Sequence, residues 1–288
     1  MRTIVVLGAS GMLGHQVIRW TSERCNTVAV LRSSSPPEGF PRNLPAELIL
    51  GFAATNLEAM RSLLERSRPT DVVNCIGVIK QRLGNSDVAE AIRVNALFPH
   101  QLAQLCQSVE ARLIHISTDC VFAGTRGSYT ESDPTDAIDV YGRTKALGEP
   151  IGSQALTLRL SMIGPELRYH VSLLDWFVAQ QHGAVRGYTQ AFFSGLSTPL
   201  LAREIRRLVC ELPDLNGLWH VTAARISKYE LLCKIRDAFG LDVRVTPDDV
   251  YQCDRSLIGD AYAGRTGFVP PSWGEMLDEL ANLQTYSD

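Results

Sequence analysis

The stretch Thr3–Gly14 reads TIVVLGASGMLG, and it decides the fold of the chain that follows. Its first five residues are apolar or β-branched, as in a buried parallel strand, and three glycines follow at the spacing G-x-x-G-x-x-G. Gly8 allows a sharp turn, Gly11 lets the backbone approach a pyrophosphate, and Gly14 lets helix and strand pack closely. The stretch therefore predicts a dinucleotide-binding strand–loop–helix unit, with cofactor contacts from Gly8, Ser10, Gly11, Met12 and Leu13.

The first half of the chain continues this alternation of strands and helices. Strand-like runs are Thr3–Leu7, Thr27–Leu31, Glu47–Leu50, Asp71–Cys75, Arg112–Ile116 and Leu156–Leu160. Helical patterns lie between them at Gly11–Glu23, Leu57–Arg66, Asp87–Cys106 and Tyr141–Glu149. Continuous apolar strands that alternate with helices predict an α/β fold with a Rossmann-type, doubly wound parallel sheet.

The regular alternation ends near Gly164. Further helical patterns lie at Leu173–Gln181, Leu200–Leu212, Lys228–Phe239 and Trp273–Asn282. We expect residues 1–165, with parts of 196–222, to form the cofactor-binding domain. Residues 166–288 would then form a smaller C-terminal α/β cap that binds substrate.

Composition excludes several classes of protein. The chain has 288 residues, of which 45% are apolar and 20% are charged, and its formal net charge is −3. These values exclude a disordered chain and argue against a surface that binds nucleic acid throughout. No run of about 18 apolar residues is present, so we expect no membrane span.

The seven cysteines favour a reducing compartment. Their number is odd, no two are spaced C-x-x-C, and the N-terminus lacks the features of a secretory signal peptide. We therefore expect a cytoplasmic protein with free thiols. No His/Cys cluster has metal-ligand spacing, so no metal site is expected.

The end of the second strand indicates which dinucleotide is bound. NAD sites usually present an acidic residue there for the ribose 2′-hydroxyl, whereas an arginine accommodates the 2′-phosphate of NADP. Here Arg32 and Ser33 follow the strand, and no acidic residue is near. The sequence favours NADPH, although a solvated surface arginine would look the same.

A pair of residues on one predicted helix suggests acid–base chemistry. Tyr141 and Lys145 are spaced Y-x-x-x-K, which places both on one helix face. A neighbouring ammonium is expected to lower the pKa of a phenol from its usual value of about 10, which suits a general acid or base. Ser117 and Thr118 follow an apolar strand 23 residues earlier, and Thr118 can offer a hydroxyl to the same substrate oxygen. Turn capping is the alternative role for these two hydroxyls.

Together these residues resemble the extended short-chain dehydrogenase/reductases. Further points of likeness are Asn74–Gly77 after a strand and Asn95 in a long helix. The closest resemblance is to the dTDP-4-dehydrorhamnose reductase group, carried by Ile116–Asp119, Val121–Gly124 and Leu158–Ser161.

The resemblance implies an NADPH-dependent reductase of a nucleotide-linked 4-keto-6-deoxy sugar. Tyr141 would protonate the C4 oxyanion, Lys145 would hold the nicotinamide ribose, and Thr118 would hydrogen-bond the carbonyl oxygen. Cofactor contacts are implied for Cys75, Ile76, Gly77, Asn95, Ser117, Tyr141 and Lys145. Asn95 would order the site rather than take part in chemistry. The substrate diphosphate needs cationic donors, for which the candidates are Arg186, Arg225 and Arg255.

Two departures from the group leave alternatives open. The stretch Gly51–Ala54 lacks the acidic residue that many relatives use to bind adenine. Cys120 stands where rhamnose-type reductases have tyrosine, and GDP-fucose synthases resemble this chain there and in a histidine corresponding to His170. In that group the Cys/His pair epimerises the substrate before reduction, so both residues are candidate substrate contacts.

In two further alternatives the substrate undergoes no net oxidation or reduction. One is an epimerase that retains its NAD. The other is a non-catalytic, NADP-binding regulatory subunit such as that of methionine adenosyltransferase, which need not keep Thr118, Tyr141 and Lys145. The sequence does not specify the nucleotide, the sugar or the C4 stereochemistry, and a homodimer is one possible oligomeric state.

Overall fold

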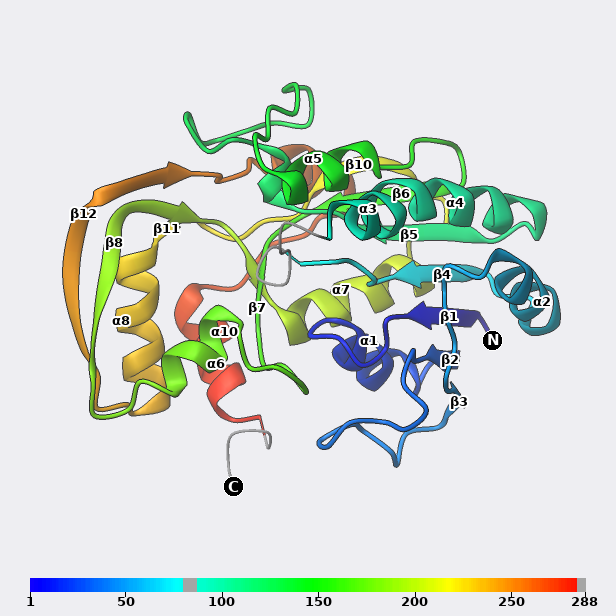
Figure 1. The fold of residues 1–288 in the computed structure, drawn as a ribbon, viewed down its shortest axis with the longest axis horizontal. Coiled ribbons are helices and arrows are strands. Elements are labelled where there is room, and N and C mark those ends of the chain that lie inside the picture. The colour runs from blue at the N-terminus through cyan, green and yellow to red at the C-terminus, as the bar shows by residue number, and fades with distance from the viewer. Residues whose placement is uncertain (80–86, 284–288) are drawn as a thin grey trace.

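Seven parallel strands form the central sheet. They are β1 (Thr3–Leu7), β2 (Asn26–Val30), β3 (Ala46–Ile49), β4 (Asp71–Asn74), β5 (Arg112–Ile116), β6 (Ala155–Arg159) and β10 (Gly217–His220). The computed structural model describes residues 1–79 and 87–283, and in it these strands lie in the order β10-β6-β5-β4-β1-β2-β3 (Figure 1). All neighbouring pairs in this sheet are parallel. The predicted α/β fold with a Rossmann-type parallel sheet is confirmed.

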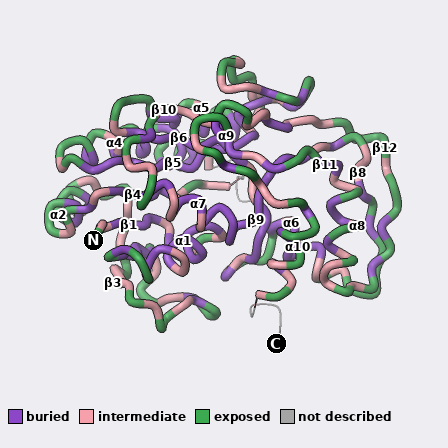
Figure 2. The backbone as a smooth tube through the Cα atoms, turned by 180° about the vertical axis from the view of Figure 1, so that it is seen from behind, coloured by how far each residue is buried: buried purple, intermediate pink, exposed green. Residues whose placement is uncertain are grey.

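Helices cover both faces of this sheet. The even-numbered residues of β1 pack in a core with α1 (Gly14–Thr21) and α7 (Thr198–Cys210). The odd-numbered residues pack in a second core with α2 (Leu57–Ser67) and α4 (Phe98–Ser108). Strands buried on both faces explain the continuous apolar runs in the sequence. Figure 2 shows this buried interior along β1, α1 and α7.

The predicted elements of the first half are found, with ends that differ by three residues or fewer. The long helix predicted over Asp87–Cys106 comprises α3 (Val88–Ala91), a π-helical segment η2 (Ile92–Leu97) and α4. The helix that carries Tyr141 and Lys145 is α5 (Val140–Leu147). The dinucleotide-binding helix α1 begins at Gly14 rather than Gly11, because the preceding residues form turns.

A smaller, three-stranded sheet lies beside the large one. It contains β8 (Ala184–Phe193), β11 (Ile226–Ser227) and β12 (Arg244–Asp254) in the order β11-β8-β12. Sequence analysis missed β8 and β12. Pro247 and the acidic residues after it obscure the pattern of β12, which tolerates them because it is a largely exposed edge strand.

Short elements complete the second half. They are β7 (Met162–Ile163), α6 (Leu173–Val178), β9 (Leu196–Ser197), α8 (Lys228–Phe239), α9 (Asp260–Thr266) and α10 (Trp273–Ala281). β10 lies in the large sheet next to β6, with α7 before it in the chain. The domain boundary at residue 165 stays a prediction. No helix among the described residues is long and apolar enough to cross a membrane.

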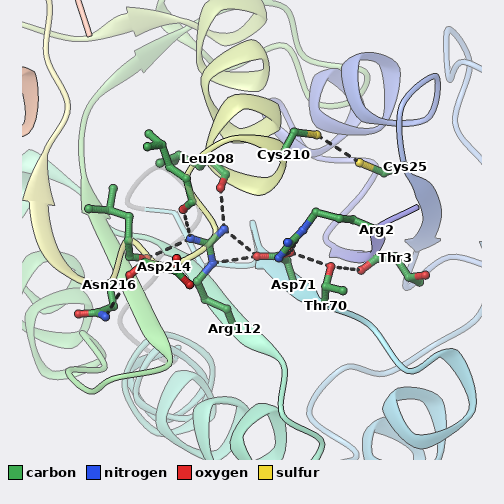
Figure 3. Close-up of polar contacts among 12 residues, drawn as sticks. Arg2, Thr3, Cys25, Thr70, Asp71, Arg112, Leu208, Cys210, Asp214 and Asn216 are labelled. Carbon is green, nitrogen blue, oxygen red and sulfur yellow. Dashed lines mark hydrogen bonds and ion pairs between the residues drawn. The ribbon is translucent and has the colours of Figure 1, made fainter. Parts of the chain in front are cut away.

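All seven cysteines are free thiols. The sulfur atoms of Cys25 and Cys210 are 3.8 Å apart, between the start of β2 and the end of α7 (Figure 3). Burial raises the pKa of Cys25 to about 12, and the neighbouring Cys210 thiol adds to this rise. Cys25 is therefore held as the thiol rather than the thiolate, and the cytoplasmic location expected from the free cysteines stays a prediction.

A buried arginine ties α7 to the amino-terminal edge of the large sheet (Figure 3). Arg112 on β5 donates to the carboxylate of Asp71 on β4 at 2.8 Å. It also donates to the carbonyl oxygens of Leu208, Leu212 and Leu215, at 2.8, 2.7 and 3.0 Å. These carbonyls lie at and beyond the end of α7, where a helix leaves its last acceptors unpaired. One guanidinium therefore satisfies both a buried carboxylate and a helix terminus.

Replacing Arg112 with alanine should lower the free energy of unfolding by about 3–5 kcal/mol, because Asp71 would keep its buried charge and lose a partner. Urea unfolding followed by circular dichroism would measure this loss. The matched control is Arg66→Ala, which removes an exposed ion pair with Glu47. That control should change the free energy by less than about 1 kcal/mol. Equal losses in the two variants would contradict the assigned role of Arg112.

Candidate active site

A large cavity opens at the carboxyl ends of the central strands and extends to the smaller sheet. Its volume of about 1320 Å³ exceeds the roughly 300–1,000 Å³ of a typical small-ligand pocket, so it can hold two ligands. Its walls include the glycine loop after β1, the ends of β2, β4 and β5, the helix α5, and parts of β8, α8 and β12. Parallel α/β sheets bind their ligands at this edge.

The glycine loop forms one wall of the cavity. Its lining residues are those predicted to contact the cofactor: Gly8, Ser10, Gly11, Met12 and Leu13. Gly8 has a φ of +76°, in the left-handed region that favours glycine. A β-carbon at Gly14 would lie 2.2 Å from the carbonyl oxygen of Gly8, so only glycine fits where α1 begins. The loop is therefore held tight against β1, in the strand–turn–helix form that suits a pyrophosphate.

The cavity continues past the end of β2. Arg32 and Ser33 line it there, where sequence analysis placed the 2′-phosphate of NADP. The stretch Phe52–Thr55, which carries no acidic residue, lines it as well. Arg168 from the second half of the chain also reaches this region, and no motif in the sequence indicated it.

The residues that follow β4 line the cavity, as expected for cofactor contacts, but Asn95 does not. Cys75, Ile76 and Gly77 line the cavity. Asn95 was predicted to contact the cofactor, yet it is buried and lies outside the cavity lining. Its side chain accepts from the backbone N–H of Val78 at 2.8 Å and donates to the Val78 carbonyl at 3.0 Å. It also donates to the Thr144 hydroxyl at 3.3 Å, so it joins the loop after β4 to α5.

Helix α5 presents Tyr141 and Lys145 to the cavity. Asp139 begins the helix by accepting from the backbone N–H of Gly142 at 2.8 Å. A β-carbon at Gly142 would lie 2.1 Å from the carbonyl oxygen of Cys120, so the helix packs directly on the segment after β5. The Lys145 ammonium donates to the carbonyl oxygen of Ile116 at 2.7 Å, which fixes α5 to the end of β5.

The pKa values of this pair differ from the sequence-based expectation. Burial raises the pKa of Tyr141, and the neighbouring Cys120 adds to the rise. A hydrogen bond with Thr118 acts in the opposite direction. The predicted lowering was wrong because removal from water raises the pKa, and the nearby acidic groups Asp119 and Asp139 raise it further. Burial also lowers the pKa of Lys145 to about 8, and Glu149 opposes this change.

Ser117 and Thr118 line the cavity at the end of β5. Ser117 donates its hydroxyl to Glu149 at 2.6 Å, so this side chain is held by the protein. The Thr118 hydroxyl accepts from the backbone N–H of Cys120 at 3.1 Å and interacts with Tyr141. Thr118 therefore caps the short helix η3 (Asp119–Val121), the alternative considered for it, and also faces the tyrosine.

The structure does not bring together the predicted Cys120 and His170 pair. Cys120 lines the cavity, and its pKa is raised to about 12, chiefly by burial. His170 is exposed, lies outside the cavity lining and forms a 3.2 Å contact with Asp175. The prediction that His170 contacts the substrate is therefore corrected, because its side chain contacts Asp175 of α6 instead.

Two of the three candidate cap arginines line the cavity. Arg186 lines it and pairs with Asp248 at 3.1 Å. Arg255 lines it and donates to the carbonyl oxygen of Phe122 at 2.8 Å. Arg225 lies outside the lining, because it pairs with Asp254 at 2.7 Å.

Sequence analysis also missed a lysine in this wall. Lys228, the first residue of α8, lines the cavity with its ammonium 3.8 Å from the centre of the Phe193 ring. Burial lowers its pKa to about 8, while the charge of Asp119 opposes this shift. Tyr188 and Tyr251 line the cavity beyond it, with ring centres 5.0 Å apart. These side chains come together from β8, α8 and β12, and no local motif signals that.

Comparison with protein families and curated proteins agrees with the resemblance seen in the motifs. A family model described as RmlD substrate binding domain matches residues 1–263. The chain is 36% identical over 148 residues to the dTDP-4-keto-6-deoxy-D-glucose reductase of Streptomyces niveus. That match covers 50% of this chain and 45% of the relative, so it spans less than half of the relative's length.

Other relatives match over most of their length. A probable low-salt glycan biosynthesis reductase of Haloferax volcanii is 34% identical over 257 residues, which cover 85% of this chain and 83% of the relative. Methionine adenosyltransferase 2 subunit beta of Mus musculus is 26% identical over 261 residues, covering 83% and 73%. A crystal structure of dTDP-4-dehydrorhamnose reductase from Bacillus anthracis in complex with NADP has a TM-score of 0.79 at 21% identity, covering 97% and 98% of the two chains.

The glycine loop gives a direct test of the dinucleotide end of the cavity. Gly14→Ala should destabilise the fold by about 1–3 kcal/mol and weaken NADP⁺ binding at least tenfold, because its β-carbon would displace the loop. Chemical unfolding and titration of NADP⁺ would measure the two effects. Gly152→Ala is the control, since a β-carbon there meets no atom within 4 Å. If Gly14→Ala bound NADP⁺ as tightly as this control, the loop would not be the phosphate site.

Proposed function

Because this chain belongs to the RmlD substrate binding domain family, we propose that it is an NADPH-dependent sugar-nucleotide reductase. It reduces the C4 ketone of a nucleotide-linked 4-keto-6-deoxy sugar, in deoxysugar biosynthesis for a surface polysaccharide or glycoconjugate. The main support is that Thr118, Tyr141 and Lys145 line the same cavity as the glycine loop. A hydride donor and a ketone bound in one cavity can then meet beside a proton donor.

The residues of the cavity fit a dinucleotide. The tight glycine loop suits the pyrophosphate, and Arg32 lies at the end of β2, where a 2′-phosphate is expected. Cys75, Ile76 and Gly77 form the wall between this end and α5. NADPH would supply the hydride.

Tyr141 is assigned the role of general acid. Its raised pKa keeps the phenol protonated at neutral pH, so it retains a proton for the oxyanion that forms at C4. Thr118 interacts with the Tyr141 side chain, so it is suited to hydrogen-bond the same substrate oxygen. Lys145 is anchored to the carbonyl oxygen of Ile116, and its ammonium would hold the nicotinamide ribose in place.

The sugar nucleotide is assigned to the part of the cavity formed by the second half of the chain. Arg255 and Lys228 both interact electrostatically with the buried Asp119, beside Thr118. Two cations against one carboxylate leave a local excess of positive charge. This excess suits the diphosphate of the substrate, which would carry its sugar toward Tyr141.

One observation favours a different function. The similarity to methionine adenosyltransferase 2 subunit beta covers 83% of this chain, so a regulatory subunit that binds NADP is the second candidate. The epimerase–reductase alternative has less support, because Cys120 is a buried thiol with a raised pKa and His170 lies outside the cavity lining. Turnover of a 4-keto sugar nucleotide separates the reductase from the regulatory subunit.

Tyr141→Phe should lower kcat by about 10²–10⁴-fold, because it removes the proton donor and leaves the ring in place. NADPH oxidation, followed at 340 nm with GDP-, UDP- and dTDP-linked 4-keto-6-deoxy sugars, would measure this. NADP⁺ affinity should change less than about twofold, since a phenol contributes little to binding the dinucleotide.

The matched control for the acid is Tyr229→Phe, which lies outside the cavity lining and should retain full kcat. Full activity in Tyr141→Phe would exclude this residue as the acid. If the unaltered protein bound NADPH and turned over none of these sugars, the regulatory-subunit function would be favoured.

Lys228→Met should weaken binding of the nucleoside diphosphates dTDP, GDP or UDP by roughly 10- to 100-fold, because a charge-assisted contact to phosphate is lost. Calorimetric titration would measure it, with Lys234→Met as a control because Lys234 is exposed on the same helix. Binding by the unaltered protein should also weaken as the pH rises through about 8, where Lys228 loses its charge. A Lys228→Met variant that keeps both the affinity and this pH dependence would exclude Lys228 from the phosphate site.

A further inference from the structure

An arginine from the second half of the chain lies at the end of β2. The guanidinium Nη2 of Arg168 is 3.4 Å from the hydroxyl oxygen of Ser33, a residue 135 positions earlier. Arg32, Ser33 and Arg168 all line the large cavity. The end of β2 is where Rossmann-type folds distinguish a 2′-hydroxyl from a 2′-phosphate on the adenosine ribose. Arg168 therefore enters the cofactor end of the site from a segment outside the expected cofactor-binding domain.

Buried contacts hold this segment against the loop after β2. Leu167, next to Arg168, is buried, and so is Phe40 of that loop. The side chain of Leu167 comes within 3.4 Å of the point where a β-carbon at Gly39 would lie. The position of Arg168 is thus fixed through its neighbour, by packing between two segments distant in sequence.

Hydrogen bonds fix the same segment from its other side. The Glu166 carboxylate accepts from the backbone N–H groups of Val171 and Ser172, at 2.7 and 3.1 Å. The backbone N–H of Glu166 donates to Asp175 at 2.9 Å. The nearby carboxylate of Glu166 is therefore engaged by backbone donors. Arg168 therefore lies in a short segment that is anchored on both sides, at Glu166 and at Val171.

The charge of this corner is unbalanced. Within residues 1–79 and 87–283, neither Arg32 nor Arg168 forms an ion pair with a carboxylate. A phosphate monoester carries a charge of about −1.5 to −2 at pH 7, so two guanidinium groups would match it closely. Guanidinium groups also present planar pairs of N–H donors that fit phosphate oxygens.

We propose that Arg168 and Arg32 together bind the 2′-phosphate of NADP(H), with Ser33 between them. Arg168 is a specificity-determining residue for the cofactor, and the substrate half of the chain thereby takes part in choosing NADP(H) over NAD(H). This inference rests on the proposed function for the identity of the cofactor. It goes further by assigning the 2′-phosphate to a residue outside the β2 region.

A purely structural role for Arg168 makes a different prediction. If its contact with Ser33 served only to order the loop after β2, its loss would weaken binding of every dinucleotide alike. If Arg168 contacts the 2′-phosphate, its loss would weaken binding only of ligands that carry this group. Comparing NADP⁺ with NAD⁺ therefore separates the two roles without requiring turnover.

The experiment is calorimetric titration of the whole chain with NADP⁺ and with NAD⁺. Arg168→Gln should weaken NADP⁺ binding roughly 10- to 100-fold, the usual effect of losing a hydrogen bond between charged groups, and change NAD⁺ binding less than about twofold. The NADP⁺ affinity of Arg168→Lys should lie between that of Arg168→Gln and that of the unaltered protein, because lysine keeps the charge and loses the planar donors. Arg42→Gln is the matched control, since Arg42 is an exposed arginine of the loop after β2 and lies outside the cavity lining.

Adenosine 2′,5′-bisphosphate provides a second probe, because it carries the 2′-phosphate without the nicotinamide half. Its affinity should fall in Arg168→Gln by the same factor as that of NADP⁺. Thermal unfolding of each variant would identify any that fails to fold, and Arg168→Lys then supplies the comparison.

Three outcomes would overturn the inference. They are unchanged NADP⁺ affinity in Arg168→Gln, an equal loss for NADP⁺ and NAD⁺, and a similar loss in the Arg42→Gln control. A failure of the proposed function looks different. In that case the unaltered protein would bind NADP⁺ well and depend on Arg168, yet would reduce none of the 4-keto sugar nucleotides.

Discussion

The carboxylate of Glu149 makes the interactions on which the geometry of the candidate active site depends. It accepts two hydrogen bonds from Arg159 on β6, at 2.9 and 2.7 Å, and one from Ser117 after β5, at 2.6 Å. Its charge also raises the pKa of Lys145 against the effect of burial. The ion pair is almost fully buried, so loss of either partner would leave an uncompensated charge. Glu149 thereby links the segment after α5 to the end of β5 and to β6, which flank Tyr141 and Thr118.

The distribution of cations explains how a protein of net charge −3 could bind the two anionic ligands that the proposed function requires. Arg32 and Arg168 lie at one end of the cavity, and Arg255 and Lys228 lie near Asp119 and the proposed catalytic residues. A few local cations in a partly buried cleft act more strongly than the same charges spread over a wet surface. Under the proposed function, the two ligands would occupy different parts of one cavity and meet beside Tyr141.

The parts predicted from sequence are those that depend on local physics. The first strand and its glycines, the apolar runs of the large sheet and the Tyr141/Lys145 spacing each carry their signal within a few residues. The strands β8 and β12 were missed because half-exposed strands with polar and proline residues lack such a signal. Arg168 and Lys228 were missed for another reason, since each acquires its role from packing against residues far along the chain.

Burial explains why the pKa shift predicted for Tyr141 had the wrong direction, and it bears on the direction of the proposed reaction. The spacing of Tyr141 and Lys145 suggested a lowered pKa, but removal of the phenol from water raises it. A phenolate is needed to take a proton from an alcohol, whereas a phenol is needed to give one to an alkoxide. A raised pKa therefore favours reduction of the ketone over oxidation of the alcohol at neutral pH.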